Sequence, residues 1–372
     1  MGDPDFTIQP QRLRQLLRRL IDIYSPSGKE EELLQFLHTY LKRHGLRVVR
    51  QPVDDYRHNL LVLPASDDIR LALIGHLDTV AAHDLEDYGF SEAGDDIAGL
   101  GAADMKGGCA AMVEAFVSLH QQGCSGLPAA LALVVGEEED GDGAQRLVKD
   151  YHFPWAIIGE PTDLQPCFSH YGYLEIELVT RGRRIHASLA NTGQNPINAM
   201  LQLLLRFSHH LESRRPEVVY NIRELSSSQA GFVVPERCEA WLDNHLPPAA
   251  AIGEIMLELE ELLARERQEN PHLDATLRFA TIHSGYQIPE KGALAEALKT
   301  LYAKYSLEWK PQAFRSHSDA SLLWAAGVKP ILLGPGQLEK AHAADESVSF
   351  RQVCLAAQLY LDLLTSIGSG AP

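Results

Sequence analysis

Imidazole and carboxylate side chains follow apolar runs of the sequence. The run LALIG is followed by His76, and the run WAIIG is followed by Glu160. ALALVV leads, after one glycine, to three glutamates that begin at Glu137, and PILLGPG leads to His342. Like charges that crowd together repel, and burying any of them is costly. So much negative charge at the mouths of buried strands indicates either a solvated acidic loop or a bound cation.

The types of these side chains suit a metal centre. Nitrogen and oxygen ligands without sulfur are typical of zinc, cobalt or manganese sites. Asp104, in the glycine-rich turn GLGAADMKGG, adds a further carboxylate. Two histidines and three carboxylates are enough for two ions that share one bridging carboxylate. Paired divalent ions polarise a carbonyl and lower the pKa of a bound water.

Asp78 stands two residues beyond His76, on the same side of an extended segment. A carboxylate there can orient a ligating imidazole through its second nitrogen. Each of these motifs is weak when taken alone, because single histidines and aspartates are more often packing or surface residues. The combination of all of them carries the prediction.

The elements that must position these residues alternate between helix and strand. Segments with apolar residues at helical spacing, such as residues 11–25 and 104–123, separate continuous apolar runs of strand length. This pattern predicts an α/β fold with a mostly parallel sheet and helices on both faces. The carboxyl ends of its strands would form one crevice and bring the donors together. Ser27 and Glu30 fit a capping box at the start of a helix.

The sequence pattern changes in the middle of the chain. Strands of alternating polarity and two amphipathic helices follow one another in residues 175–282, which indicates a small α+β domain. The apolar runs then return. We therefore predict one catalytic domain formed by residues 1–174 and 283–372, with a smaller domain of residues 175–282 inserted into it.

Composition and charge exclude several classes of protein. The 372-residue chain has a formal net charge of -17, which argues against nucleic acid or an anionic membrane as a partner. Its five cysteines are scattered and form no CxxC pair, which indicates reduced thiols and a cytoplasmic location. No apolar run approaches the length of a membrane span, and the N-terminus lacks the apolar core of a signal peptide.

Five motifs, in order along nearly the whole chain, resemble those of the dizinc amidohydrolases. This family includes acetylornithine deacetylase, succinyl-diaminopimelate desuccinylase, aminoacylase and glutamate carboxypeptidase. The motifs are GHLDTV, GLGAADMKGG, GEEEDGDGA, GEPTD and LGPGQLEKAHAADE. The resemblance implies a hydrolase or metallopeptidase acting on linear amide bonds. It also implies a dinuclear zinc domain, with cobalt or manganese as alternatives, and an inserted lid domain that makes the protein a homodimer.

The resemblance implies a role for each candidate metal ligand. His76 and Glu160 would bind the first ion, with Asp78 as the partner that orients His76. Asp104 would bridge the two ions, and His342 would bind the second.

The three glutamates allow two assignments, because the family places a general base directly before a ligand. With Gly143 aligned to a glycine of the family pattern, Glu137 is the base and Glu138 the ligand of the second ion. A shift by one residue makes Glu138 the base and Glu139 the ligand. We favour the first assignment.

The implied reaction removes an acyl group from an N-acyl amino acid. Glu137 would take a proton from a metal-bridged water as it attacks the carbonyl carbon, and then pass a proton to the leaving amine. His186, in RGRRIHASLANTG, corresponds to a lid histidine that stabilises the oxyanion, often from the partner subunit. The alternative for His186 is a surface histidine in a basic strand.

The substrate is less well defined, because the chain departs from the family pattern at two places. LDNHLPP has His245 where members often carry an arginine, and SHSDASLL has Ser321 where desuccinylases have one. His245, Asn221 and Arg315 are candidates for substrate binding. The motif LGPGQLEKAHAADE favours an acetylornithine deacetylase-like enzyme for a small N-acyl amino acid or dipeptide. SPSGKEEELL and VVGEEE also resemble deacylases of carrier-bound lysine and ornithine biosynthesis.

Three alternatives to this function stay open. They are a zinc carboxypeptidase or dipeptidase, a succinyl-diaminopimelate desuccinylase, and a non-catalytic binding protein. The occupied ligand positions speak against the last of these.

Overall fold

The computed structural model describes residues 7–66, 68–82, 84, 88–124, 126–192, 195–228 and 231–368. The chain divides into two compact units. Unit 1 comprises Met1–Phe168, Ile288–Phe314 and Ser318–Pro372, and unit 2 comprises Ser169–Gln287 and Arg315–His317. The predicted division into a catalytic and an inserted domain stays a prediction.

The strands of unit 1 form one large and one small sheet. The large sheet runs in the order β1-β2-β6-β3-β7-β17-β8, with β16 also paired to β8, and β18-β5-β4 form the small one. The bounds are β1 Val48–Pro52, β2 His58–Val62, β3 Leu71–His76, β4 Ser91–Ala93, β5 Asp96–Ala98, β6 Ala129–Val134, β7 Trp155–Ile158, β8 Cys167–His170, β16 Gln312–Phe314, β17 Lys329–Leu332 and β18 Ser347–Ser349.

The four central strands of the large sheet, β6, β3, β7 and β17, are parallel. Every residue of β3 and β6 is buried, so both faces of the sheet are covered there. Continuous apolar strands are what such a sheet requires. The predicted α/β fold with a mostly parallel central sheet is confirmed.

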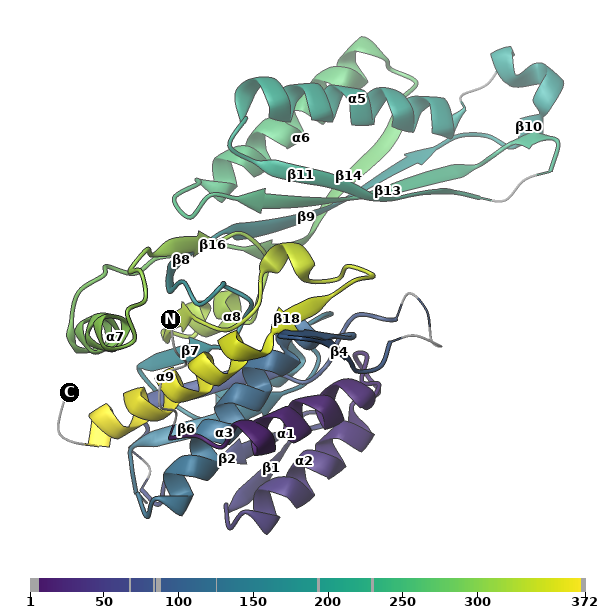
Figure 1. The fold of residues 1–372 in the computed structure, drawn as a ribbon. Coiled ribbons are helices and arrows are strands. Elements are labelled where there is room, and N and C mark those ends of the chain that lie inside the picture. The colour runs from purple at the N-terminus through teal and green to yellow at the C-terminus, as the bar shows by residue number, and fades with distance from the viewer. Residues whose placement is uncertain are drawn as a thin grey trace. The chain divides into compact units, whose positions relative to one another are not determined.

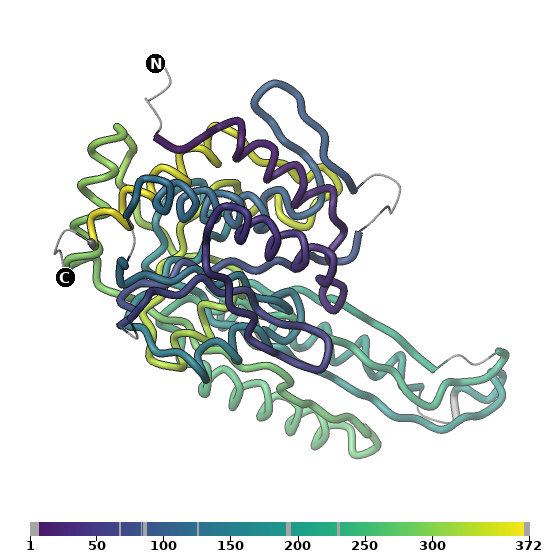
Figure 2. The backbone as a smooth tube through the Cα atoms, turned by 90° about the horizontal axis from the view of Figure 1, so that it is seen from below, coloured from purple at the N-terminus to yellow at the C-terminus, as the bar shows by residue number. Residues whose placement is uncertain are grey.

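Helices cover this sheet. Helix α3 packs on β3 and β6 and against α1 and α9, whereas α4 packs on β2 and β6 and against α8. Figure 1 shows α1, α3 and α9 together, and Figure 2 shows α1 beside α9 although they come from opposite ends of the chain. The bounds are α1 Pro10–Asp22, α2 Glu31–Arg43, α3 Gly107–Gln121, α4 Asp142–Asp150, α7 Ala293–Lys304, α8 Ala320–Ala325 and α9 Phe350–Gly368, with short turns at η1 Ala102–Lys106 and η3 Leu338–Lys340.

Helix α2 begins differently from the sequence prediction. It starts at Glu31, and no side chain caps its first turn. The hydroxyl of Ser27 instead donates a hydrogen bond to the Asp78 carboxylate at 2.6 Å. The predicted capping box is therefore wrong, because the Ser27 hydroxyl donates to a carboxylate of another segment instead of capping the helix.

Unit 2 contains an antiparallel sheet in the order β11-β13-β9-β14. Along β9 and β13 residues are alternately buried and half-buried, as in a sheet covered on one face. Side chains of α5 and α6, among them Phe207 and Leu259, form a core with Ile176 of β9. The bounds are β9 Gly172–Arg181, β10 Ile185–His186, β11 Val219–Ser227, β12 Val233–Val234, β13 Arg237–Leu246, β14 Asp274–His283, β15 Tyr286–Gln287, α5 Pro196–Arg214 and α6 Ile252–Glu269, with a short turn at η2 Ala187–Thr192.

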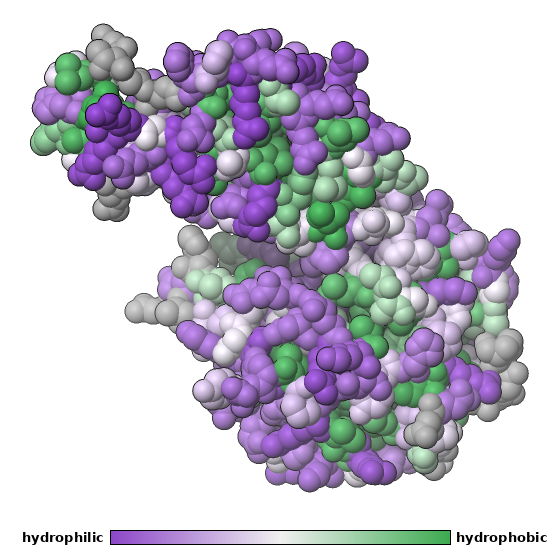
Figure 3. Space-filling model, turned by 180° about the vertical axis from the view of Figure 1, so that it is seen from behind, coloured by the Kyte–Doolittle hydropathy of each residue, from purple (hydrophilic) through white to green (hydrophobic). Residues whose placement is uncertain are grey.

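Apolar side chains at the surface are dispersed among polar ones. The face shown in Figure 3 is mostly hydrophilic, with hydrophobic residues in small groups. In the part of the chain that the structure describes, no helix has both the length and the apolar character needed to cross a bilayer.

Candidate metal centre

Three neighbouring parallel strands place the donors at one edge of the large sheet. His76 is the last residue of β3, Glu137 follows β6 after two residues, and Glu160 follows β7 after one. Because β6, β3 and β7 run side by side in the same direction, their carboxyl ends lie together. This is the crevice where ligands bind in open α/β sheets.

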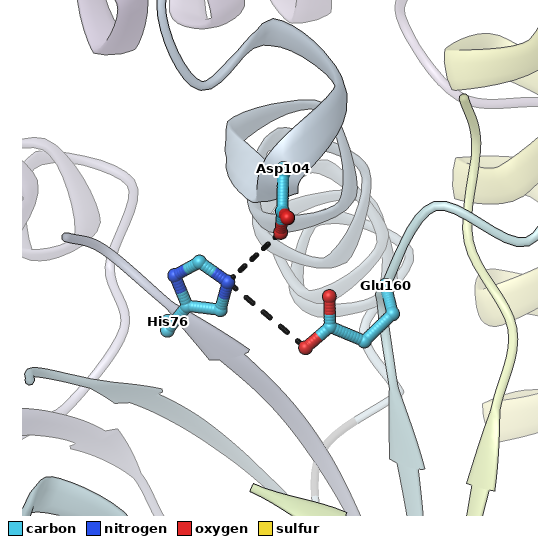
Figure 4. A group of neighbouring side chains, drawn as sticks. All are labelled: His76, Asp104 and Glu160. Atoms are coloured by element: carbon cyan, nitrogen blue, oxygen red, sulfur yellow. Dashed lines mark hydrogen bonds and ion pairs between the residues drawn. The ribbon is translucent and has the colours of Figure 1, made fainter. Parts of the chain in front are cut away.

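His76, Asp104 and Glu160 form the first donor group (Figure 4). The Nε2 atom of His76 lies 3.1 Å from Oδ1 of Asp104 and 3.9 Å from Oε1 of Glu160. One donor atom from each residue lies within 4.8 Å of the other two. All three side chains are buried. The resemblance implies that these three residues bind the first ion, with Asp104 shared with the second.

Asp104, Glu138 and His342 form the second donor group. Nε2 of His342 lies 3.1 Å from Oε1 of Glu138 and 3.5 Å from Oδ2 of Asp104. Asp104 therefore offers one oxygen to each group, which is the arrangement that a bridging carboxylate requires. The turn that carries Asp104 lies between β5 and α3, and its peptide bond to Met105 is cis.

The three consecutive glutamates 137–139, called here the glutamate row, differ in burial. Glu137 is 8% exposed, and its Oε2 atom lies 3.8 Å from Nε2 of His76. Glu138 is half-buried and faces His342, whereas Glu139 is exposed. Among the described residues, Glu139 belongs to none of the donor groups. Glu137 forms a third donor group with His76 and Glu138, and it belongs to neither of the two groups that share Asp104.

Asp78 is fully buried and holds the glutamate row. Its Oδ1 accepts the backbone N–H of Glu137 at 3.1 Å, and its Oδ2 accepts the backbone N–H of Glu138 at 3.0 Å. The Nδ1 atom of His76 lies 3.0 Å from the backbone carbonyl of Asp78 and 3.8 Å from its carboxylate. Asp78 therefore contacts the imidazole mainly through its main chain.

The electrostatics of the cluster fit bound cations. Burial, together with neighbouring carboxylates, raises the pKa of both Glu137 and Glu160 well above the ordinary value. The Oε1 atom of Glu160 is buried and, within the described residues, has no hydrogen-bond partner. Burial alone would lower the pKa of His76, but its hydrogen bond to Asp104 and the other nearby carboxylates raise it well above the usual value. Crowded carboxylates with orphaned oxygens match a pair of divalent ions.

In the described part of the chain, a cysteine lies beside the donors without joining any of their groups. The Sγ atom of Cys109 lies next to His76 and donates to its backbone carbonyl at 3.0 Å. Burial raises the pKa of this thiol to about 12, and among the described residues the sulfur belongs to none of the donor groups. The donors are therefore imidazole and carboxylate, which suits zinc, manganese or cobalt.

The remaining predicted site residues belong to unit 2. His186 is exposed at the end of β10, and its Nδ1 lies 2.8 Å from the hydroxyl of Ser188. Asn221 is exposed on β11, and Arg315 is also exposed. His245 lies on β13 beside the ring of Tyr173, and burial lowers its pKa. Their roles stay predictions.

Sequence reasoning missed three polar residues around the centre. They are Ser27, which donates to Asp78, Asp319, whose pKa burial raises to about 8, and Glu346, whose carboxylate accepts three backbone N–H groups. All three stand in quoted motifs, since SPSGKEEELL contains Ser27, SHSDASLL contains Asp319 and LGPGQLEKAHAADE ends in Glu346. Nothing in a motif distinguishes a buried carboxylate from an exposed one.

Comparison with known proteins agrees with this geometry. The model of "Peptidase family M20/M25/M40" matches residues 72–366. The chain is 28% identical to an acetylornithine deacetylase of Edwardsiella ictaluri over 86% of each chain. It is 27% identical to a "Probable carboxypeptidase" of Aspergillus terreus, over 93% of this chain and 84% of that one.

Solved structures share the fold. A tripeptidase from Staphylococcus aureus superposes with a TM-score of 0.82 at 20% identity, over 98% of this chain and 100% of that one. The Bacillus subtilis YXEP protein, described as a dinuclear metal binding peptidase, gives a TM-score of 0.69 at 14% identity, over 96% and 98%. The resemblance found in the five motifs is thereby confirmed. The chain belongs to peptidase family M20/M25/M40 and is a metal-dependent hydrolase of amide bonds.

Proposed function

We propose that the protein removes the acyl group from small N-acyl amino acids, in the manner of acetylornithine deacetylase, with two zinc ions at the carboxyl edge of the large sheet. The observation that carries the proposal is the pair of three-donor groups that share Asp104. The similarity to the deacetylase of Edwardsiella ictaluri supports the substrate class.

Each proposed ligand belongs to one of the two donor groups that share Asp104. His76 and Glu160 would hold the first ion, Glu138 and His342 the second, and Asp104 both. When bound, two divalent ions polarise an amide carbonyl and lower the pKa of a water molecule. The residues of the chain supply the remaining chemistry.

Glu137 is the proposed general base. It takes a proton from the attacking water and passes a proton to the leaving amine. Its carboxyl is buried next to His76 and stays outside the two groups that share Asp104. The exposed position of Glu139 supports Glu137 and Glu138, and not Glu138 and Glu139, as the base and the ligand.

We assign the recognition of substrate to residues of the smaller domain and to Arg315. His186 would donate to the oxyanion, and Asn221, His245 and Arg315 would hold the substrate carboxylate. In this proposal residues 175–282 form a lid and dimerisation domain, inserted between residues 1–174 and 283–372 of a cytoplasmic homodimer. Light scattering of the purified protein tests the dimer.

A carboxypeptidase or dipeptidase is the second candidate function. The names of the Aspergillus terreus relative and the Staphylococcus aureus structure favour it. A succinyl-diaminopimelate desuccinylase is less well supported, because Ser321 replaces the arginine expected in its motif.

A hydrolysis panel separates these functions. N-acetyl, N-succinyl and N-formyl amino acids and a set of dipeptides are offered to the protein loaded with zinc or cobalt. Release of acetate from N-acetyl amino acids, and its loss in Glu137→Gln, is the expected result. Cleavage of dipeptides alone establishes the peptidase. No turnover of any substrate with two ions bound favours a binding protein.

A further inference from the structure

Glu346 lies in the same segment as His342, and its carboxylate is buried against the turn of Asp104. Its side chain is 4% exposed. Oε1 accepts the backbone N–H groups of Ala103 and Asp104, each at 2.9 Å. Oε2 accepts the backbone N–H of Gly101 at 2.9 Å. One carboxylate therefore binds three amides of a single turn.

This turn cannot satisfy those amides by helical hydrogen bonds. Gly101 is in the left-handed region at a φ of 78°, and Asp104 has an extended backbone with φ -119° and ψ 98°. A buried amide without a partner costs about 1–3 kcal/mol. The conformation that presents Asp104 to the two donor groups thus depends on an acceptor supplied from elsewhere in the chain.

The acceptor comes from the segment that also supplies a donor. A single turn joins His342 to Glu346, closed by a hydrogen bond from the Glu346 amide to the Ala343 carbonyl at 3.1 Å. The backbone carbonyl of Glu346 also accepts the Gly99 amide at 3.1 Å. The strand β18, which begins at the next residue, pairs with β5 just before the turn. The segments of Asp104 and His342 are therefore fastened to each other.

We propose that Glu346 is a positioning residue of the metal centre, which fixes the backbone of residues 101–104 so that the two oxygens of Asp104 face the two donor groups. The inference rests on the metal centre of the proposed function. Glu346 touches neither substrate nor metal in this role, and it acts through Asp104. A residue that orients a ligand in this way commonly changes metal affinity about 10- to 100-fold when it is replaced.

A glutamine at this position would test the role with little change in shape. The amide of a glutamine has one acceptor oxygen, which can keep the two amides now bound by Oε1. Its NH₂ group would meet the N–H of Gly101 donor to donor. Glu346→Gln should therefore loosen the turn without opening a cavity.

Glu114 provides the matched control. Its carboxylate is also fully buried, and it accepts the backbone N–H of Gln9 at 2.8 Å and the guanidinium of Arg12 at 2.7 Å. Glu114 belongs to none of the donor groups of the described residues. Glu114→Gln should lower the melting temperature and leave metal affinity unchanged.

The experiment measures three quantities without substrate. They are zinc affinity by chelator competition, the visible spectrum of the cobalt-loaded protein, and amide hydrogen exchange of residues 99–106 in the metal-free protein. For Glu346→Gln we expect a loss of at least 10-fold in zinc affinity, an altered cobalt spectrum, and faster exchange at Gly101, Ala103 and Asp104. Wild-type affinity and exchange, with only the fall in melting temperature that Glu114→Gln shows, would overturn the proposal.

A second variant keeps the test decisive if Glu346→Gln does not fold. Glu346→Asp keeps both acceptor oxygens on a shorter side chain. It should therefore retain more zinc affinity and amide protection than Glu346→Ala, which has no acceptor. Failure of Glu346→Asp to differ from Glu346→Ala in these readouts also overturns the proposal. Amide exchange reports the hydrogen bonds that Glu346 accepts from the turn even if no substrate of the panel is cleaved. The two proposals can therefore fail separately.

Discussion

The two ends of the parallel strands in unit 1 differ in what they bury. At the amino ends, Leu71 of β3 and the half-buried Trp155 of β7 line a mostly apolar pocket of about 140 Å³ that is partly open to solvent, together with residues of α7 and α9. At the carboxyl ends, the same two strands lead to His76 and Glu160, which are buried among carboxylates. Burial of apolar surface at the amino ends stabilises the folded state. Burial of charge at the carboxyl ends destabilises it. Stability and chemistry thus occupy opposite edges of one sheet.

The largest expected effect is on turnover, at the charged end. Glu137→Gln should lower kcat about 10²- to 10⁴-fold, because a general base contributes that much to proton transfer. The free energy of unfolding of the metal-free protein should not fall, since the variant removes a buried acid. Steady-state kinetics, metal content and urea denaturation check this.

Glu139→Gln is the control for that variant, because Glu139 is exposed. An equal loss of kcat in Glu139→Gln, accompanied by loss of metal, would move the base and ligand one residue along. If Glu137→Gln instead unfolds the protein, the charged end is structural and the contrast between the ends fails.

The counterpart lies within the apolar part of β3. Leu73 is fully buried, and Leu73→Ala should lower the free energy of unfolding by about 2–5 kcal/mol through lost burial and the cavity left behind. The kcat of the folded fraction should stay unchanged. A fall in kcat with full metal content would show that the sheet does not separate stability from chemistry.

Bound metal ions should offset much of the free-energy cost of burying charge at the carboxyl ends of the strands. Zinc at 100 times its Kd should raise the free energy of unfolding by about 2.7 kcal/mol, because it binds only the folded state. Asp104→Asn should show a smaller increase at the same zinc concentration, since Asp104 belongs to both donor groups. Thermal unfolding with and without zinc measures both, and equal increases would exclude a shared ligand.

The smallest effect concerns the pH dependence of the metal-free protein. Burial raises the pKa of Glu160 above 4.5, so the folded state holds its proton more tightly than the unfolded state. Stability from this group is complete below pH 4.5 and is lost as pH rises through the folded-state pKa. Glu137 acts with the same sign, whereas Asp104, with its pKa lowered by the hydrogen bond to His76 against the effect of burial, acts with the opposite sign.

Glu160→Gln should remove the contribution of Glu160. The melting temperature of the variant minus that of the wild type, measured with chelator present, should increase as pH rises above 4.5. A difference that stays constant or decreases with pH would show that Glu160 is not buried as a costly charge.

Much of the donor set could be predicted from the sequence, because parallel strands have a simple geometry. His76, Glu137 and Glu160 follow three apolar runs, and strands of one direction must bring such positions together. His342 follows a fourth apolar run at a greater distance, and Asp104 stands in a glycine-rich turn, so their roles as ligands rest on the resemblance. The structure places both within the same donor group.

The contacts that support the donors could not be predicted. The carboxylate of Asp78 accepts the amides of Glu137 and Glu138, and its main chain contacts His76. Spacing places Asp78 near His76 but does not distinguish its carbonyl from its carboxylate. The contact between Glu346 and the turn of Asp104 depends on the conformation of two distant segments, which no local pattern encodes.

The order of the donors along the chain has a consequence for biosynthesis. The first donor group is complete once the ribosome has added Glu160, whereas the second also needs His342, which is synthesised much later. A nascent polypeptide therefore carries every residue of one donor group long before it carries those of the other. Under the proposed assignment, the site of the first ion can form before the site of the second.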